Sequence, residues 1–313
     1  MKFISRAAAA VLVGWAIIRL AGADRVHRVE APVAPLLSFT PFIAAAAPAV
    51  TLLQRRRCGA VAAALAGSAL AAVVMPRAIK RQQPDARGPI LRVLTANLLA
   101  GRASEDAVVD LVWRSRADVL FVQELTDDAT SRLKQAGLND LLPHSVTDAS
   151  SAGPCGSGIY TRFPLSDGPA IKPISVAQPT ARMELPAGQV VDLVCVHPQP
   201  PTPVTSRRKA ARWRKELSVL PRPADVPRVL AGDFNATFDH SHFRRLLRLG
   251  YADAAAQKGK GLVPTWGPKG KPALLTIDHV LLDARCAVLQ VSVHTLPGTD
   301  HRAVFTEFRL PGG

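Results

Sequence analysis

The pattern of hydrophobic and polar positions changes near residue 76 of this 313-residue chain. Before that point lie three long apolar runs, Ala7 to Ala23, Ala31 to Leu53 and Cys58 to Met75. Arg19 is the only charged residue in the first run, and the other two carry none. Runs of this length and purity predict transmembrane helices rather than buried helices of a soluble core. Prolines make the second run irregular, which membrane helices tolerate. We therefore expect a membrane region of two or three helices over residues 1–75.

The first apolar run has two interpretations. Residues 1–6 form a basic n-region, and Ala21-Gly22-Ala23 resembles a small-residue cleavage site, so the run is either a transmembrane helix or a signal peptide. Arg55-Arg56-Arg57 is the densest basic cluster between two runs, which predicts a cytoplasmic loop. The third run then crosses outward and places the rest of the chain outside the cytoplasm. Four basic residues beyond the third run oppose this orientation, namely Arg77, Lys80, Arg81 and Arg87.

The net charge of +15 is also divided near this boundary. Residues 1–87 hold 12 Lys or Arg and 3 Asp or Glu, which gives +9 and leaves +6 for the remainder. Most of the excess thus lies beside apolar segments, where positive charge sets membrane orientation rather than binding nucleic acid. Residues 76–88 are polar, basic and bracketed by proline or glycine, and we expect them to form a juxtamembrane linker.

From residue 89 onward, short apolar strands alternate with helical segments. Expected helices cover 104–115, 126–136 and 206–220. Polar residues stand at or near the ends of six expected strands: Asn97, Glu124, His197, Asp233 with Asn235, Asp278, and Asp300 with His301. Such a set of carboxylates, amides and histidines is typical of metal-assisted phosphoryl transfer. Its hard oxygen ligands suit Mg²⁺ or Mn²⁺, and the chain has no cysteine or histidine spacing that favours zinc.

The stretch from Val229 to Ala236 carries two of these polar residues. Gly232 allows the backbone to turn and a ligand to approach closely. If the strand continues through Asp233 and Asn235, their side chains point to the same face. A carboxylate and a carboxamide side by side can hold a water and a phosphate oxygen together.

Seven motifs in this order resemble the endonuclease/exonuclease/phosphatase superfamily, over about residues 90–310. They are Thr95-Ala96-Asn97, Val122-Gln123-Glu124, Gly158 to Pro164, His197-Pro198, Gly232-Asp233-Phe234-Asn235, Ile277-Asp278-His279 and Thr299-Asp300-His301. The resemblance implies an α/β fold, a four-layer sandwich of two packed mixed β-sheets flanked by helices. It would occupy a catalytic domain over residues 89–313, preceded by the membrane region.

The resemblance also implies a metal site and a substrate contact. Glu124 would be the main ligand of a Mg²⁺ or Mn²⁺ ion, with Asn97 beside it, and Asp300 would support the metal region. Arg162, in the motif that ends at Pro164, would face either substrate or the surface.

Catalytic roles follow from the resemblance in the same way. Asp233 would orient or deprotonate the attacking water, and Asn235 would hold the phosphate. His301 would contact a phosphate oxygen in the transition state, with its ring oriented by Asp278. His197 matches a histidine that the deoxyribonuclease branch uses as an acid or as a phosphate contact.

The sequence as a whole indicates a membrane-anchored, metal-dependent phosphodiesterase or phosphatase whose catalytic domain faces the exterior. Its expected partners are the lipid bilayer and a phosphoester, either a lipid headgroup, a nucleic acid or a soluble phosphate, with no obligate protein partner. One alternative is a nuclease acting on DNA outside the cell, although a domain charge of +6 does not require nucleic acid. Another is a membrane-tethered binding module without catalysis, against which the intact polar set argues.

Three further features carry expectations. Outside the cytoplasm a disulfide can form, and Cys155 and Cys195 are the favoured pair. His279 should face away from Asp278 on its strand and be structural. Pro198 to Pro203 form a stiff loop after His197, which is a candidate wall for the active-site cleft.

Overall fold

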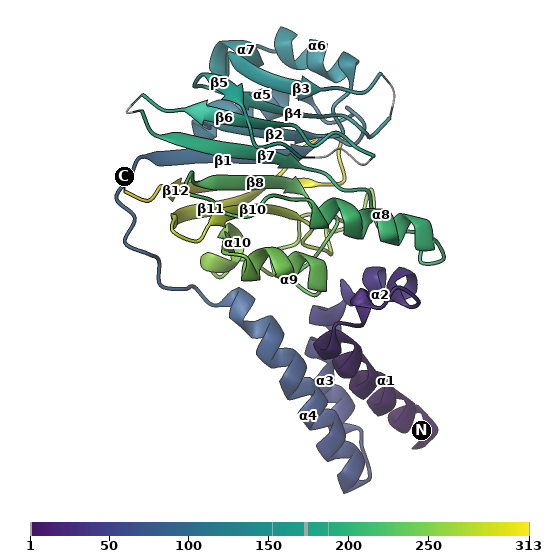
Figure 1. Ribbon diagram of the computed structural model, residues 1–313. Helices are drawn as coiled ribbons and strands as arrows, with labels where there is room; N and C mark the ends of the chain where they lie inside the picture. Colours follow the sequence, from purple (N-terminus) through teal and green to yellow (C-terminus); the bar gives the residue numbers. More distant parts are fainter. Residues whose placement is uncertain (1, 152, 172–174, 187, 313) are drawn as a thin grey trace.

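The computed structural model describes residues 2–151, 153–171, 175–186 and 188–312. Met1, the first residue of the predicted n-region, lies outside the described residues. The chain forms two parts, an α/β sandwich and a group of N-terminal helices that extends from one side of it (Figure 1).

Two six-stranded sheets form the centre of the sandwich, ordered β11-β12-β1-β2-β4-β3 and β5-β6-β7-β8-β10-β9. Within both sheets neighbouring strands are antiparallel, except for the parallel pairs β1–β2 and β7–β8, so both sheets are mixed as predicted. The first sheet consists of β1 (Ile90–Asn97), β2 (Val119–Gln123), β3 (His144–Asp148), β4 (Ser157–Thr161), β11 (Ala287–Thr295) and β12 (Arg302–Arg309). The second consists of β5 (Leu165–Asp167), β6 (Thr180–Glu184), β7 (Val190–Val196), β8 (Arg228–Asp233), β9 (Tyr251–Asp253) and β10 (Asp278–Asp283).

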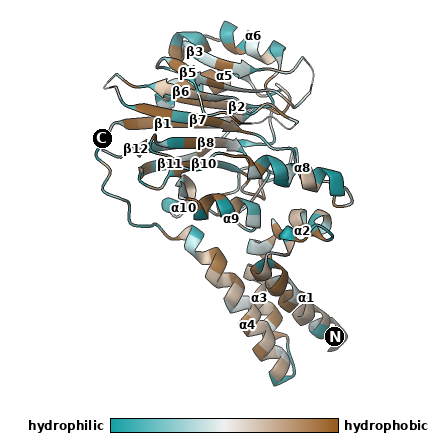
Figure 2. Ribbon diagram, in the orientation of Figure 1, coloured by the Kyte–Doolittle hydropathy of each residue, from teal (hydrophilic) through white to brown (hydrophobic). Residues whose placement is uncertain are grey.

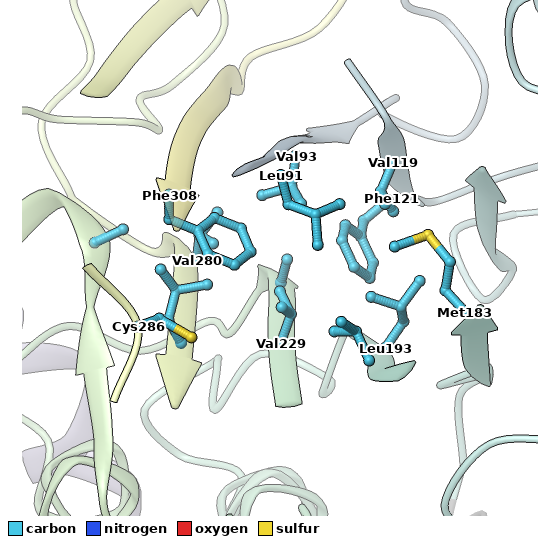
Figure 3. Close-up of a cluster of buried hydrophobic side chains, with 14 of the residues drawn as sticks. Leu91, Val93, Val119, Phe121, Met183, Leu193, Val229, Val280, Cys286 and Phe308 are labelled. Carbon is cyan, nitrogen blue, oxygen red and sulfur yellow. The ribbon is translucent and has the colours of Figure 1, made fainter. Parts of the chain in front are cut away.

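The two sheets pack face to face over one hydrophobic core (Figure 3). Because side chains alternate along a strand, Leu91 and Val93 of β1 point into this core while Leu94 and Ala96 point to the outer helices. Val229 of β8 enters the same core from the opposite sheet. This two-residue period determines which side chains lie between the sheets.

Helices cover the outer face of each sheet. The first sheet packs against α5 (Glu105–Ser115), α6 (Asp127–Gln135) and α7 (Leu138–Leu141), and the second against α8 (Arg207–Ser218), α9 (Ser241–Arg248) and α10 (Ala254–Gln257). The hydroxyls of Ser104, Thr126 and Ser206 accept backbone N–H bonds at the starts of α5, α6 and α8. The predicted four-layer arrangement is therefore confirmed for the catalytic domain.

The N-terminal part contains α1 (Lys2–Ala21), η1 (Ala23–Arg25), α2 (Glu30–Leu37), α3 (Thr40–Leu52), α4 (Arg57–Val74) and η2 (Met75–Ala78). Helices α1, α3 and α4 pack side by side and point away from the sandwich, and they are mostly apolar (Figure 2). The second apolar run is not one straight span, because α2 and α3 meet at an angle of 73°. Among the described residues, Arg57–Ala78 is the one helical stretch long and apolar enough to cross a membrane, with the bent α2–α3 pair as a second if it acts as one span.

A buried ion cluster joins the N-terminal helices to the sandwich. Asp239, which is fully buried, accepts bonds from Arg19 of α1 at 2.6 Å and from both terminal nitrogens of Arg77 at 2.6 and 2.7 Å. Burial would raise the pKa of the Asp239 carboxyl, but the bonds and charges of Arg77 and Arg19 outweigh it and hold the pKa below its usual range. The cluster fixes the end of α1 and the segment after α4 to the same loop of the sandwich.

Residues 76–88, the predicted linker, lie along the sandwich. The Arg81 N–H donates to the carbonyl of Gln257, and Gly88 N–H donates to the carbonyl of Leu310. The Gln83 side chain accepts from the N–H of Val288 in β11. The segment therefore holds the domain close to the end of α4 rather than on a free tether.

The predicted Cys155–Cys195 disulfide is wrong. Both residues are free thiols, and Cys155 lies in an exposed loop while Cys195 is fully buried. Cys195 is on β7 and points between the sheets, where its sulfur contacts the Gln123 amide nitrogen at 3.3 Å and the Val122 carbonyl at 3.4 Å. Strand alternation thus directs this thiol into the core and away from the loop.

We expect Asp239→Ala to lower the free energy of unfolding by about 3–5 kcal/mol, because it leaves two buried guanidinium groups without their carboxylate. Since the folded-state pKa of Asp239 is depressed, its stabilisation should be complete above about pH 4 and lost as the pH falls through that lower pKa. Denaturant unfolding of the detergent-solubilised chain measures both the loss of unfolding free energy and its dependence on pH. Asp85→Ala, which removes an exposed pair with Arg87, is the control and should change stability by less than about 0.5 kcal/mol. Equal effects of the two substitutions would contradict a stabilising role for the cluster.

Candidate active site

The polar residues predicted at strand ends gather at one edge of the sandwich. The parallel pairs β1–β2 and β7–β8 end at this edge, and the antiparallel strands β10 and β12 begin there. Asp278 is the first residue of β10, so it lies at a strand end as expected. The sheet faces that pack together are apolar along most of the strands, and they become polar at this edge.

A hydrogen bond joins the two sheets at the centre of the site. The Asn97 amide nitrogen, at the end of β1, donates to Asp233 Oδ2, at the end of β8, at 3.2 Å. The same nitrogen lies 3.1 Å from Glu124 Oε1, and the Ala100 N–H donates to Glu124 Oε2 at 2.7 Å. The three predicted residues are therefore in one hydrogen-bonded group, although 136 positions separate Asn97 from Asp233.

Strained backbone concentrates around this group. Among the described residues, five that are not glycine have positive φ, and four of them adjoin the site, namely Leu99, Ala100, Glu124 and Asn235. Each such conformation costs about 1–3 kcal/mol and persists only where the surrounding contacts hold it. Glu124, with φ of 56°, leaves β2 by this sharp turn, which brings its carboxylate to Asn97.

The strand reasoning for Asn235 and Gly232 requires two corrections. Strand β8 ends at Asp233, and Asn235 has φ of 47°, so no strand continues through both residues. Their side chains still meet, because Asn235 Nδ2 donates to Asp233 Oδ2 at 3.4 Å, and the Asn235 backbone N–H donates to Asp233 Oδ1 at 2.8 Å in a local turn. Gly232 serves close strand packing rather than ligand approach: a Cβ there would lie 2.0 Å from the Val196 carbonyl oxygen.

His301 and Asp278 form the pair that was predicted. His301 Nδ1 lies 3.0 and 3.1 Å from the two Asp278 oxygens, and Nε2 lies 3.7 Å from Asp233 Oδ2. Burial would lower the pKa of His301, but the Asp278 and Asp233 carboxylates outweigh it and raise the pKa to about 10. His301 is therefore an imidazolium at neutral pH, fixed by Asp278 at Nδ1 with Nε2 free for the cleft.

At Asp233 and His197, in contrast, burial is the effect that prevails over the neighbouring charges. Burial raises the pKa of Asp233 to about 7, with the charge of His301 opposing the change. His197 is almost fully enclosed, and burial together with repulsion from His301 lowers its pKa to about 4. Asp233 is thus suited to accept a proton near neutral pH, and His197 is a neutral imidazole there.

Asp300 is a second carboxylate near Nε2 of His301. Its Oδ2 accepts a bond from the Trp266 indole at 3.1 Å, and its Oδ1 lies 4.0 Å from His301 Nε2. The Oδ1 atom is buried and has no hydrogen-bond partner among the described residues. Sequence reasoning missed Trp266, because no spacing relates this tryptophan to Asp300; only the bridge between Trp266 and His301 brings them together.

Two sets of side chains are candidates for a divalent cation. Oxygen and nitrogen atoms of Asp233, Asp278 and His301 lie within 4.8 Å of one another, but a protonated His301 cannot act as a ligand. Glu124 and Asp300 fit better. Burial raises the pKa of Glu124, the Asp300 charge adds to that rise, and a cation would relieve both. Asp300 Oδ1, which is buried without a hydrogen-bond partner among the described residues, is consistent with Glu124 and Asp300 as the cation ligands.

A pocket of about 630 Å³ opens over these residues. Glu124, Asp233 and His301 line its base, and the predicted proline loop contributes Pro200 and Pro201 to its wall. Lys209 of α8 is the only lysine or arginine among the described residues that line it. The sequence did not indicate that residues of the N-terminal helical region also line this pocket, as Pro35, Ser38 and Phe39 do.

Arg162 was expected to face substrate or the surface, and it does not lie at this site. It directly follows β4, which is antiparallel to β2, so it lies at the start of β2 while Glu124 follows its end. Its guanidinium is 3.7 Å from Asp118 and half-exposed. His279 is structural as expected, since its two ring nitrogens bond to Asp253 and to the Ala236 carbonyl at 2.8 and 2.9 Å.

Comparisons with solved structures agree with this fold. An endonuclease/exonuclease/phosphatase from Beutenbergia cavernae is 19% identical, with 72% of each chain covered and a TM-score of 0.55. A humanized D. rerio TDP2 carrying 14 mutations is 18% identical, with 70% of this chain and 99% of that chain covered and a TM-score of 0.56. An AP endonuclease from Archaeoglobus fulgidus is 15% identical, with 69% and 98% covered and a TM-score of 0.55. At these identities the likeness establishes the fold alone.

The sequence itself carries the family assignment. A comparison with curated proteins gives no match. Residues 94–301, about two thirds of the chain, match the endonuclease/exonuclease/phosphatase family as a whole, and this range includes every polar residue of the site. The chain therefore belongs to the endonuclease/exonuclease/phosphatase family.

Proposed function

We propose that this protein is a membrane-anchored phosphodiesterase or phosphatase that hydrolyses a phosphoester by attack of an activated water. Family membership supports a phosphoester hydrolase. The observation that carries the proposal is the contact of the Asp278–His301 pair with Asp233, which in turn bonds to Asn97 at the base of a pocket. This arrangement places a proton acceptor and a fixed positive charge within 4 Å of each other.

In the proposed reaction, Asp233 takes a proton from water while the water oxygen bonds to phosphorus and the ester P–O bond breaks. The departing oxygen takes a proton from solvent. The imidazolium of His301 neutralises charge that develops on a phosphate oxygen in the transition state. His197, neutral by its lowered pKa, fits a hydrogen-bond contact to phosphate better than an acid. Asn235 holds Asp233 through its own N–H and bonds to the Pro198 carbonyl at 2.9 Å through its side chain.

A divalent cation, Mg²⁺ or Mn²⁺, would be held by the carboxylates of Glu124 and Asp300, with Asn97 beside them. When bound it would supply a Lewis acid that neutralises phosphate charge. The donor set is all oxygen, as such hard cations prefer. Asn97 donates to Glu124 through its amide nitrogen while its Oδ1 accepts the Leu99 N–H, so the amide would orient the Glu124 carboxylate.

Hydrolysis of bis-p-nitrophenyl phosphate by the purified full chain tests the proposed function. We expect activity with Mg²⁺ or Mn²⁺, loss with EDTA, and loss in Asp233→Ala. Glu124→Gln should weaken Mg²⁺ binding, measured directly by calorimetry, by about tenfold or more. Glu184→Gln, an exposed change on β6, is the matched control. Rescue by Zn²⁺ alone, or unchanged Mg²⁺ binding in Glu124→Gln, would refute the metal assignment.

The Asp278–His301 pair should act as a unit in catalysis. We expect His301→Ala to lower kcat by about 10² to 10⁴, because a transition-state charge contact is lost. Asp278→Asn should reproduce much of that loss, and the double variant should be little worse than His301→Ala alone. A kinetic cycle with saturating Mg²⁺ on one substrate measures all three.

Two variants complete the cycle. His294→Ala, on β11 and outside the pocket lining, is the histidine control and should keep full activity. His197→Ala should be milder than His301→Ala. Additive losses at Asp278 and His301 would mean that the pair is not a functional unit, and an inactive His197→Ala beside a mild His301→Ala would reverse the two roles.

The membrane part of the proposal is supported by how α1, α3 and α4 pack. Their mutual contacts are made mainly by small residues, including Ala47 and Gly67, where a Cβ on Gly67 would lie only 2.6 Å from that of Ala47. Large apolar side chains point outward instead, with Leu52 86% and Leu65 67% exposed. Small residues inside and large apolar residues outside are typical of helices packed in lipid.

The orientation is supported by where charge lies along this bundle. At the end far from the sandwich, Gln54 bonds to the Ser5 carbonyl, which brings Arg6 close to Arg55, Arg56 and Arg57 (Figure 1). At the near end Arg77, which opposed the predicted orientation, is buried in an ion pair with Asp239 that it shares with Arg19. The basic cluster at the far end has no ion pair among the described residues, which favours a cytoplasmic far end and an extracytoplasmic catalytic domain.

Cysteine labelling of intact cells tests this orientation. A membrane-impermeant maleimide should label Cys155, which is exposed on the catalytic domain, and should reach Cys58, beside Arg57, only after permeabilisation. Cys155→Ser and Cys58→Ser assign the label, while the buried Cys195 and Cys286 should stay unmodified. Labelling of Cys58 but not Cys155 in intact cells would reverse the orientation.

A further inference from the structure

The corner between α2 and α3 belongs to the wall of the active-site pocket. Pro35, Ser38 and Phe39 line the pocket that holds Glu124, Asp233 and His301. These residues lie in the second apolar run of the sequence, within the bent helix pair that can act as a membrane span. One cavity is thus built from both the catalytic domain and the membrane region.

This corner is held in place by specific contacts on both sides. On the side of the sandwich, His240 Nε2 lies 2.6 Å from the Ala34 carbonyl, and Arg214 of α8 pairs with Glu30 at 3.2 Å. On the side of the bundle, the Trp15 indole of α1 donates to the Thr40 hydroxyl, which donates to the Leu37 carbonyl at 2.7 Å. Phe39 is therefore fixed relative to the catalytic residues rather than free to swing away.

The pocket has two chemically different regions. Its base carries the acidic and imidazole groups that would meet a phosphoester. Ser38, Gln199, Thr202 and Lys209 also line the remaining wall, but most of it is apolar. Its apolar residues come from five separate parts of the chain: Pro35 and Phe39, Pro154, Val176, Pro200 and Pro201, and Leu275 and Ile277. An amphiphile would gain binding free energy by burying its apolar part against this wall, whereas a wholly polar phosphoester would not.

The position of the corner also points to the bilayer. It lies at the end of the apolar bundle nearest the sandwich (Figure 2). Phe39 is 41% exposed, and Leu36 and Phe42 beside it are exposed large apolar residues as well. An apolar surface that runs from the outside of the bundle to the pocket gives an apolar tail a path that avoids water.

We infer that the substrate is an amphiphilic phosphoester taken from the bilayer, whose apolar tail lies against Phe39 and Pro35 while its phosphate lies at His301 and Asp233. This inference rests on the proposed hydrolase function and adds a substrate class to it. The α2–α3 corner thereby acts as a specificity element as well as part of the anchor.

A homologous series of alkyl p-nitrophenyl phosphates, from methyl to octyl, tests the inference with the full chain in lipid nanodiscs and Mg²⁺. We expect kcat/KM to rise by about fourfold for each methylene that enters the pocket, until the wall is covered. In Phe39→Ala the octyl-to-methyl ratio of kcat/KM should fall by about tenfold.

Leu36→Ala is the matched control, because Leu36 is similarly exposed near the corner but does not line the pocket. It corrects for partition of the longer esters into the nanodisc lipid and should leave the octyl-to-methyl ratio unchanged. Phe39→Leu should retain most of the ratio, which separates lost tail contact from a disturbed fold.

The outcomes separate the inference from the proposed function. If kcat/KM does not change with chain length, the inference is overturned. It is also overturned if the octyl-to-methyl ratio of kcat/KM is equal in wild type, Phe39→Ala and Leu36→Ala. In both cases hydrolysis of the methyl ester would still uphold the proposed function. Equal losses on methyl and octyl esters in both Phe39 variants would also overturn it, since the residue would then serve the fold alone. No cleavage of any ester by the wild-type chain would refute the function itself.

Discussion

Packing of the two inner sheet faces is the constraint on which the rest of the structure depends. The core between the sheets requires apolar side chains at every second position of the central strands. The same alternation, continued to the strand ends, directs Asn97 on one sheet toward Asp233 on the other. A register shift of one residue would expose the core and at the same time separate the polar group.

The charge collected at this edge has its own consequence. Four carboxylates, those of Glu124, Asp233, Asp278 and Asp300, surround the single imidazolium of His301. Buried like charges are costly, which explains why burial raises the pKa of both Glu124 and Asp233. The excess negative charge favours a divalent cation and, with it, an anionic phosphoester. The metal dependence and the substrate charge that we propose thus rest on one electrostatic imbalance.

The N-terminal helices are joined to this chemistry through a short piece of chain. The loop after β8 carries Asp233 at its start and Asp239 six positions later, and Asp239 holds Arg19 and Arg77 from the helical region. The next residue, His240, contacts the corner that supplies Phe39 to the pocket. The catalytic loop therefore positions both the reacting groups and the apolar wall, which makes the anchor a functional part of the enzyme we propose.

The sequence alone determined the elements whose signals are local. Hydrophobic periodicity was sufficient to locate the main strands and helices and the polar set at the strand ends, and the ordered motifs implied the four-layer fold through their resemblance to the family. The pairing of Asp278 with His301 also came from the resemblance, because the 23 positions between them give no local signal of contact.

Contacts that depend on distant segments were decided only by the tertiary structure. The Cys155–Cys195 pairing failed because strand direction turns Cys195 into the core, and Arg162 fell outside the site because β4 runs antiparallel to β2. No periodicity or spacing in the sequence relates Trp266 to Asp300, or Phe39 to the residues of the active-site pocket. Their places are set by how the sheets, loops and N-terminal helices pack together, which is a property of the whole fold and not of any single stretch of sequence.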